Sequence, residues 1–189
     1  MNDAFFEKAL KQTLKNEGVV NGKTGYVNAK SDAGGETNYG ITIAKARECG
    51  YNGKMCDLTY ETAKQIYYNE YWKKLNAHNI ANFNISFLLF DFAVNAGVKT
   101  AAKTLQKAIN KALSEQKLKI DGIVGEKTLY EIKLITLGIG CLLSNFQKIY
   151  IAEILAYYTS LKNPNIGFAK NGAGWVNRVV KNIHFLMGI

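Results

Sequence analysis

A segment near the middle of the chain is apolar on almost every side. Residues 84–96 read NISFLLFDFAVNA, and Asp91 carries the one charge in the run. A helix that is hydrophobic all round belongs in the interior of a protein. The segment therefore predicts a central buried helix around which the rest of the chain packs.

Helical periodicity continues through most of the chain. Asp3 is a predicted N-cap for a first helix of about thirteen residues, along which apolar side chains recur at spacings of three and four. Further helices are predicted over residues 44–49, 59–75, 99–114, 126–137, 140–158 and 175–186, with Thr59 as an N-cap. Residues 18–42 are rich in Gly, Asn, Thr and Ser, and the extended stretches 26–30 and 37–41 predict a small β-hairpin. The fold class is predominantly α.

Charge divides the chain into two halves. The 24 Lys and Arg split into 11 in residues 1–98 and 13 in residues 99–189, whereas the 15 Asp and Glu split into 10 and 5. With Gly97, this shift predicts a lobe boundary near residue 98, with no long linker. A basic half favours a polyanionic partner such as nucleic acid, acidic lipid or the bacterial wall, among which composition does not choose.

Several classes of site are disfavoured by the sequence. Cys49, Cys56 and Cys141 form no CxxC pair and have no histidine cluster nearby, so we expect no metal and no cofactor.

The N-terminal residues carry acids in an amphipathic pattern and lack a continuous apolar core, so we expect no signal peptide and synthesis in the cytoplasm. The apolar stretches 85–94 and 134–143 are too short to cross a bilayer of about 30 Å. We expect a monomer without a membrane span.

Glu17 occupies an unusual place for a glutamate. It lies seven residues after Leu10 and three after Leu14, on the apolar stripe of the first helix, and Gly18 is the predicted helix stop. The negative end of the helix dipole and the loss of solvation both favour the neutral form of its carboxyl group. A general acid needs that bias near neutral pH.

A second set of polar residues flanks a glycine pair. If residues 33–36 form a four-residue loop, Asp32 and Thr37 face each other across two strands, about 5 Å apart at Cβ. Glycosidic cleavage usually needs a protonated carboxyl group and a second group that stabilises the transition state or activates water. Glu17 and Asp32 can supply these, and Thr37 can hold the water. The alternative is an exposed glutamate and an aspartate that shapes a turn.

These residues stand in a recognisable pattern. Residues 16–18 (NEG), 25–28 (GYVN) and 32–42 (DAGGETNYGIT) resemble the N-terminal signature of the glycoside hydrolase family 108 N-acetylmuramidases, with residues 19–24 as an insertion. The resemblance implies a lysozyme-like helical fold with the hairpin near the active site. It also implies Glu17 as catalytic acid, Asp32 as base or electrostatic stabiliser, and Thr37 as the water-positioning residue.

The central helix extends the resemblance, since residues 90–97 are similar to that of the same family. Asp91 and Asn95 lie four residues apart, on one face. A buried, hydrogen-bonded structural role is favoured for Asp91, and the alternative places Asn95 along the sugar cleft. Sugar C–H faces pack on aromatic rings, for which Tyr26, Tyr39 and Trp72 are candidates if they are not part of the core.

The C-terminal half resembles a second kind of unit. Leu105-Gln106 followed by residues 120–129 (IDGIVGEKTL) is similar to helical peptidoglycan-binding modules, and residues 174–178 (GWVNR) look like the closing helix of the muramidase family. A turn set by Asp121 and Gly122 explains the glycine-bearing loop equally well. Lysines at positions 99, 103, 107 and 111 line one helix face, as a solvated surface or as attachment to the wall.

The resemblance implies a peptidoglycan hydrolase that cleaves the β-1,4 bond between N-acetylmuramic acid and N-acetylglucosamine, of the endolysin type. It would act on the bacterial cell wall, in the periplasm or outside the cell. The alternatives are a lytic transglycosylase, which needs Glu17 but no water-activating pair, and a noncatalytic peptidoglycan-binding protein. A nucleic-acid partner is not expected, because the chain has no zinc motif, RNA-binding aromatic signature or basic tail.

Overall fold

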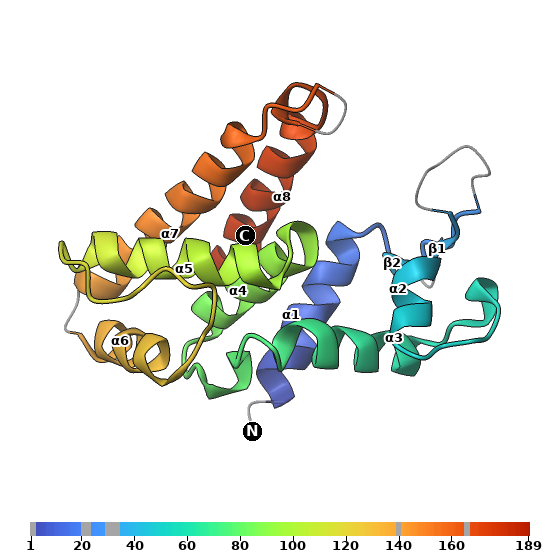
Figure 1. Cartoon of the computed structure of the whole chain (residues 1–189), viewed down its shortest axis with the longest axis horizontal. Coiled ribbons are helices and arrows are strands. Elements are labelled where there is room, and N and C mark those ends of the chain that lie inside the picture. The colour runs from blue at the N-terminus through green and yellow to red at the C-terminus, as the bar shows by residue number, and fades with distance from the viewer. Residues whose placement is uncertain (1–2, 20–23, 29–34, 139–140, 165–166) are drawn as a thin grey trace.

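The chain folds as a set of helices with one small hairpin (Figure 1). The computed structural model describes residues 3–19, 24–28, 35–138, 141–164 and 167–189. The α-helices in these ranges are α1 Asp3–Asn16, α2 Ile43–Glu48, α3 Tyr60–Tyr67, α4 Phe83–Ala96, α5 Val98–Ala112, α6 Glu126–Leu137, α7 Cys141–Ser160 and α8 Phe168–Met187. The strands are β1 Thr37–Asn38 and β2 Ile41–Thr42, and the short helical turns are η1 Met55–Asp57, η2 Tyr68–Trp72 and η3 Ala77–Asn79. The predominantly helical fold is confirmed.

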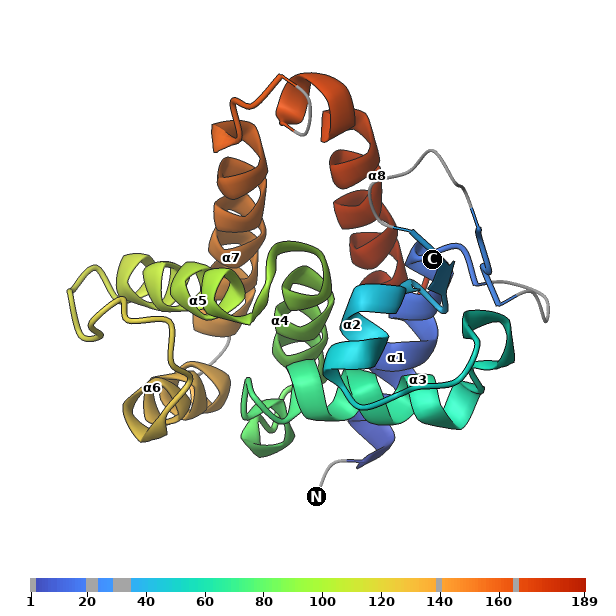
Figure 2. The same ribbon diagram turned by 45° about the vertical axis from the view of Figure 1, so that its right-hand side comes forward.

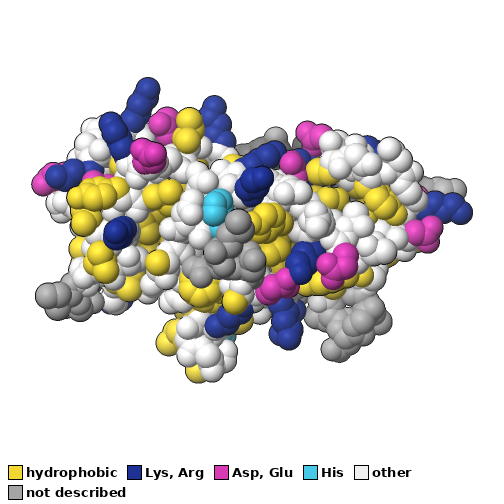
Figure 3. All heavy atoms as spheres, turned by 90° about the horizontal axis from the view of Figure 1, so that it is seen from below, with side chains coloured by type: hydrophobic (Ala, Val, Ile, Leu, Met, Phe, Trp, Pro, Cys, Tyr) yellow, Lys and Arg dark blue, Asp and Glu magenta, His cyan; other side chains and the backbone are white. Residues whose placement is uncertain are grey.

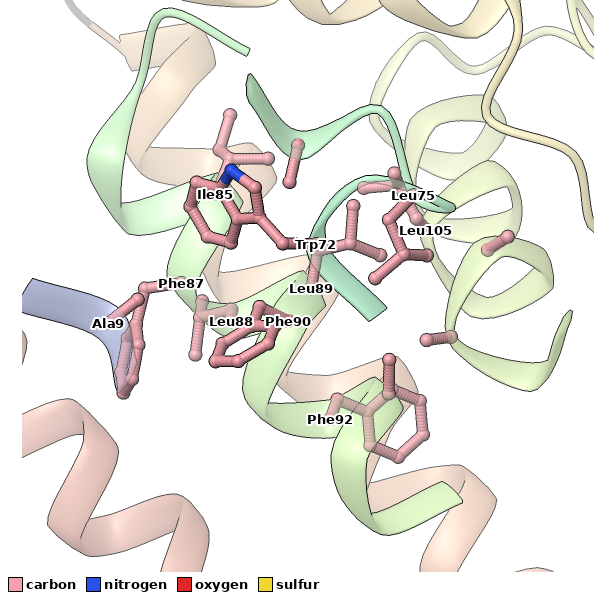
Figure 4. Close-up of a cluster of buried hydrophobic side chains, with 14 of the residues drawn as sticks. Ala9, Trp72, Leu75, Ile85, Phe87, Leu88, Leu89, Phe90, Phe92 and Leu105 are labelled. Carbon is pink, nitrogen blue, oxygen red and sulfur yellow. The ribbon is translucent and has the colours of Figure 1, made fainter. Parts of the chain in front are cut away.

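Helix α4 is the centre of the molecule, as its sequence predicts. The side chain of Asn82 caps its first turn by accepting a hydrogen bond from the Ile85 amide, and every residue from 85 to 93 is buried. Figure 4 shows α4 side chains in one cluster with Ala9 of α1, Leu105 of α5 and Trp72 of η2. One hydrophobic cluster thus includes residues on both sides of position 98.

Helix α1 buries the stripe that its periodicity predicts. Phe6, Ala9, Leu10 and Leu14 are in the core, and the Phe6 ring packs 5.5 Å from Trp72 and 5.8 Å from Phe90 between ring centroids. The helix includes Asp3 instead of beginning after it. It ends at Asn16, where Gly18 takes a left-handed φ of 83°. The carboxyl end of a well-packed helix therefore positions Glu17.

The hairpin is shorter than predicted and lies in a different register. Strands β1 and β2 pair antiparallel, with Thr37 opposite Thr42 and the turn at Tyr39 and Gly40. On its other side, Thr37 pairs with Val27 through two 2.9 Å backbone hydrogen bonds. Backbone pairing thus gives Thr37 two partners, Thr42 and Val27. Asp32 itself lies outside the described residues.

The glycine-bearing loop before α6 is held by one buried side chain. Gln106 on α5 donates to Asp121 Oδ1 at 2.8 Å and to the Ile123 carbonyl at 3.0 Å, and it accepts from the Gly122 amide at 3.0 Å. Thr128, at the start of α6, lies 3.4 Å from the same Gln106 nitrogen. The interpretation of Asp121 and Gly122 as a turn is confirmed. The Leu-Gln and Asp-Gly motifs are thus explained by the hydrogen bonds between Gln106 and the loop.

The last two helices lead the chain back to its beginning. Helix α7 packs on α5, and α8 packs on both α7 and α1; Figure 2 shows α7 and α8 as two long arms on either side of α4. Helix α8 begins seven residues before the predicted start at Trp175. Two glycines in that first part, Gly172 and Gly174, weaken the helical signal in the sequence.

The surface seen from below carries basic and acidic side chains side by side (Figure 3), with the lysines and arginines spread along the molecule. Along α5, Lys111 pairs with Glu153 of α7, and the stems of Lys99 and Lys103 lie beside Gly122. The lysine row is thus partly engaged with neighbouring elements. Within the described ranges, no helix combines the length and the apolar character needed to cross a bilayer.

Candidate active site

Glu17 directly follows the last residue of α1. Its amide donates to the Thr13 carbonyl at 3.0 Å, so the backbone still follows the helix at this point. The side chain is 23% exposed. Glu17 therefore combines a fixed backbone with a carboxylate that solvent reaches.

A cation from the far end of the chain meets this carboxylate. Arg178 of α8 donates from Nη1 to Glu17 Oε1 at 2.7 Å. The same guanidinium donates from Nε and Nη2 to the two carboxylate oxygens of Asp91, both at 2.9 Å. Arg178 thus bridges the two carboxylates. Its two hydrogen bonds to Asp91 fix the orientation of the guanidinium group.

Asp91 anchors this arrangement from the core. Its side chain is 2% exposed, and it accepts hydrogen bonds from Thr13 at 3.0 Å, Asn16 at 3.1 Å and Asn182 at 2.6 Å in addition to those from Arg178. A buried charge needs such a complete set of partners. The prediction that Asp91 is a buried, hydrogen-bonded structural residue is confirmed.

The electrostatics of Arg178 keep it charged. Burial by itself lowers the pKa of this guanidinium, but the charge of Asp91, the hydrogen bonds to it and the nearby Glu17 raise the pKa above its ordinary value. Sequence reasoning places Glu17 in an apolar setting, whereas the structure places a permanent cation against it. The difference arises because Arg178 lies 161 residues away in sequence.

The hairpin closes on Glu17 from the other side. A Cβ at Gly40 would lie 2.8 Å from Cγ and 2.9 Å from Cβ of Glu17, and 3.0 Å from the Tyr67 hydroxyl. Gly40 also has a φ of 71°. The Tyr67 hydroxyl donates to the Tyr39 carbonyl at 2.8 Å and so ties α3 to the same turn. Only glycine fits here, both for backbone conformation and for space.

Thr37 lies on strand β1, three residues before Gly40, and its side chain is partly exposed. The hairpin that carries Thr37 is therefore the one that contacts Glu17. Asp32, the predicted second carboxylate, lies outside the described residues. The roles predicted for Asp32 and Thr37 remain predictions.

The three aromatic candidates for sugar binding have different surroundings. Tyr26 is 40% exposed, and Tyr39 is partly exposed and packs edge-on against Tyr60 with ring centroids 6.2 Å apart. Trp72 is wholly buried between Phe6 and Phe90, and it therefore belongs to the core. Tyr26 and Tyr39 stay candidates.

Asn95 is exposed near the end of α4, and its Oδ1 accepts a 3.0 Å hydrogen bond from the Tyr158 hydroxyl. Its predicted role along the sugar cleft stays a prediction. No group of three or more His, Cys, Asp or Glu side chains in the described part of the chain is placed to hold a metal ion.

Comparison with known proteins fits this geometry. Residues 10–97 match the family model described as Glycosyl hydrolase 108. A search of curated proteins finds no significant match. A solved structure titled "Structure of Brucella abortus SagA" is 27% identical, with a TM-score of 0.72, and the alignment covers 95% of this chain and 92% of that one.

The matched segment contains Glu17, Gly40 and Asp91 and ends at Gly97, where α4 gives way to α5. Arg178 lies outside the matched segment, on α8. The similarity of residues 174–178 (GWVNR) to the closing helix of the muramidase family was the sequence feature that pointed to this helix. The site is therefore assembled from the matched segment and from the last helix of the chain. Residues 10–97 are thus similar to the Glycosyl hydrolase 108 family, within a predominantly helical, lysozyme-like fold.

Proposed function

We propose that this protein hydrolyses bacterial peptidoglycan as a muramidase, at the β-1,4 bond between N-acetylmuramic acid and N-acetylglucosamine. The observation that carries the proposal is the position of Glu17. Within the segment similar to the Glycosyl hydrolase 108 family, it is the partly exposed carboxyl group at the end of α1, held by Arg178 and enclosed by Gly40.

Glu17 is proposed as the general acid that protonates the leaving glycosidic oxygen. Arg178 contacts Oε1, and Oε2 has no hydrogen-bond partner within the described ranges, so Oε2 is the oxygen we assign to proton transfer. Once the proton has left, the carboxylate faces a cation that stabilises it. Because Asp91 fixes Arg178, this stabilisation needs little rearrangement during the reaction.

Asp32 and Thr37 are proposed for the second part of the reaction, with Asp32 as base or electrostatic stabiliser and Thr37 positioning the attacking water. Support comes from the hairpin, since strand β1 carries Thr37 and the following turn places Gly40 against Glu17. Asp32 precedes this strand by five residues in sequence. Such a pair of carboxyl groups is the usual requirement of glycosidases.

Attachment to the wall is proposed for the C-terminal half, which holds 13 basic and 5 acidic residues. A hollow of about 390 Å³ lies beside the Gln106-held loop, and its lining includes three lysines and two carboxylates: Lys117, Lys119, Lys127, Asp121 and Glu126. The excess of basic residues over the whole half suits the carboxylates of the bacterial wall. The proposed site of action is therefore the cell wall.

Product analysis tests the proposal. Purified peptidoglycan is digested with the full chain, and the released fragments are read by mass spectrometry. Reducing muramic-acid ends that incorporate oxygen from labelled water are expected. Products with 1,6-anhydromuramic ends would instead identify a lytic transglycosylase. Folded protein that binds walls of several types without cutting them would identify a noncatalytic wall-binding protein.

A further inference from the structure

We propose that Trp175, Tyr158 and Asn95 form a sugar-binding platform on the C-terminal side of the active site, which takes an N-acetylated pyranose ring of the glycan strand. This inference deepens the proposed function and rests on it for the identity of the glycan. It assigns substrate contacts to α7 and α8, which lie outside the matched family segment.

The platform begins with two stacked rings. Trp175 of α8 lies parallel to Tyr158 of α7, with centroids 5.0 Å apart and planes 16° apart. Tyr158 is buried beneath, where Phe92 meets it edge-on at 5.5 Å and Tyr157 packs at 5.7 Å. Trp175 is partly exposed. One face of the indole thus rests on an aromatic support that fixes its orientation.

A polar group stands beside the rings. The Tyr158 hydroxyl donates to Oδ1 of Asn95 at 3.0 Å, and Asn95 is exposed. With Oδ1 engaged, the amide nitrogen of Asn95 keeps its two donors for an outside partner. An indole face stacked on a tyrosine that carries this amide group at its hydroxyl matches an N-acetylated sugar, which offers a C–H face and hydroxyl or acetamido oxygens.

The platform lies next to Arg178 and, through it, to Glu17. Trp175 and Arg178 are three residues apart on α8, so their side chains leave the same face of the helix. Tyr158 and Arg178 also line one small cavity together with Asp91. Arg178 then reaches Glu17 at 2.7 Å. A glycan whose scissile bond meets Glu17 therefore has a neighbouring ring within reach of Trp175.

Binding can be measured without catalysis. In Glu17→Gln protein, the tetramer of β-1,4-linked N-acetylglucosamine is titrated while tryptophan fluorescence is recorded. The chain has two tryptophans, and Trp72 is wholly buried, so Trp175 is the one that a ligand reaches. A saturable change in emission is expected. The same titration with the glucose tetramer, which lacks acetamido groups, should give weaker binding.

Variants then test the assignment by calorimetry with the same tetramer. Trp175→Leu should weaken binding by about tenfold, and Trp175→Phe should restore most of it, because a flat ring is retained. Asn95→Ala, an exposed change that keeps the rings, should weaken binding by about threefold to tenfold. Tyr130→Leu, an exposed aromatic change on α6, is the matched control and should bind as the parent does.

The outcomes separate the two proposals. Sugar binding that depends on Trp175 in a protein that cuts no wall would contradict the muramidase function and keep the platform. Wall cleavage with the same KM in wild type and Trp175→Leu, together with unchanged tetramer affinity in Trp175→Leu and Asn95→Ala, would overturn the platform and keep the muramidase function.

Discussion

Arg178 donates a 2.7 Å hydrogen bond to Glu17 across 161 residues of chain. Because the same guanidinium is paired with buried Asp91, the last helix holds the carboxyl group at the end of the first one. The segment similar to the Glycosyl hydrolase 108 family, residues 10–97, thus contains Glu17 but not the cation that positions it.

Replacing Arg178 should destabilise the whole chain. In Arg178→Gln, the buried carboxylate of Asp91 loses its cation, and breaking a buried ion pair from one side costs about 3–5 kcal/mol. The free energy of unfolding from urea titration measures this. Lys181→Gln, an exposed change on the same helix, should shift it by less than about 0.5 kcal/mol. If Arg178→Gln lowered the free energy of unfolding no more than Lys181→Gln does, the pairing with Asp91 would contribute little to stability.

Gly40→Ala should damage activity by displacing Glu17. The added methyl group would lie 2.8 Å from Glu17 Cγ, and the φ of 71° adds backbone strain. Gly50→Ala is the matched control, since its φ is 84° and nothing lies within 4 Å of the added Cβ. Both variants should lose about 1 kcal/mol of stability from strain. Gly50→Ala should keep its wall-cleaving activity, whereas Gly40→Ala should lose activity because Glu17 is displaced. Equal activity in the two variants would show that Glu17 tolerates the displacement.

The buried tyrosines should resist alkaline ionisation. Burial raises the pKa of Tyr67, Tyr150 and Tyr158 well above the ordinary value. In the unfolded chain these phenols ionise near pH 10, so the folded state retains protons that the unfolded state releases above that pH. The free energy of unfolding is therefore insensitive to these groups below about pH 10 and falls as the pH rises further.

Phenolate absorbance during an alkaline titration checks this prediction. Part of the tyrosine signal should be missing near pH 10 and should be released only when the protein unfolds. In concentrated guanidinium, all eleven tyrosines should titrate together. A folded protein whose tyrosines all titrated near pH 10 would contradict the burial of these three rings.

Gln106→Leu should loosen the loop before α6. It removes hydrogen bonds to Asp121, Ile123 and Gly122, and at least the Gly122 amide then lacks its partner. The expected cost is about 1–3 kcal/mol in the free energy of unfolding. Hydrogen exchange at the Gly122 amide should become faster, whereas Lys107→Leu, an exposed neighbouring change, should leave it unchanged. Unaltered exchange in Gln106→Leu would show that other contacts hold the loop.

Local sequence patterns predicted the helices well, since each depends on periodicity within about ten to twenty residues. The all-round apolar pattern of residues 84–96 identified α4, and α6 begins and ends at its predicted residues. Weak helix formers concealed the first part of α8, around Gly172. The hairpin register was missed because short polar strands carry little apolar alternation to fix their pairing.

The candidate site was predictable only in part. The stripe of α1 identified Glu17, because helix geometry relates it to Leu10 and Leu14. Nothing within the first hundred residues indicates Arg178, and no spacing rule connects it to Asp91. The requirement for glycine at position 40 likewise depends on Tyr67 and Glu17 meeting there in space. Such long-range contacts follow from the packed fold and not from local sequence.

The role of Glu17 is tested most directly by the initial rate of reducing-end release from purified peptidoglycan. The comparison is between wild type, Glu17→Gln and Glu61→Gln, the last being an exposed glutamate on α3. Removing the general acid should lower the rate by at least about 100-fold while the fold persists, and Glu61→Gln should match wild type. A Glu17→Gln protein that released reducing ends at the wild-type rate would contradict the assignment of Glu17 as the catalytic acid.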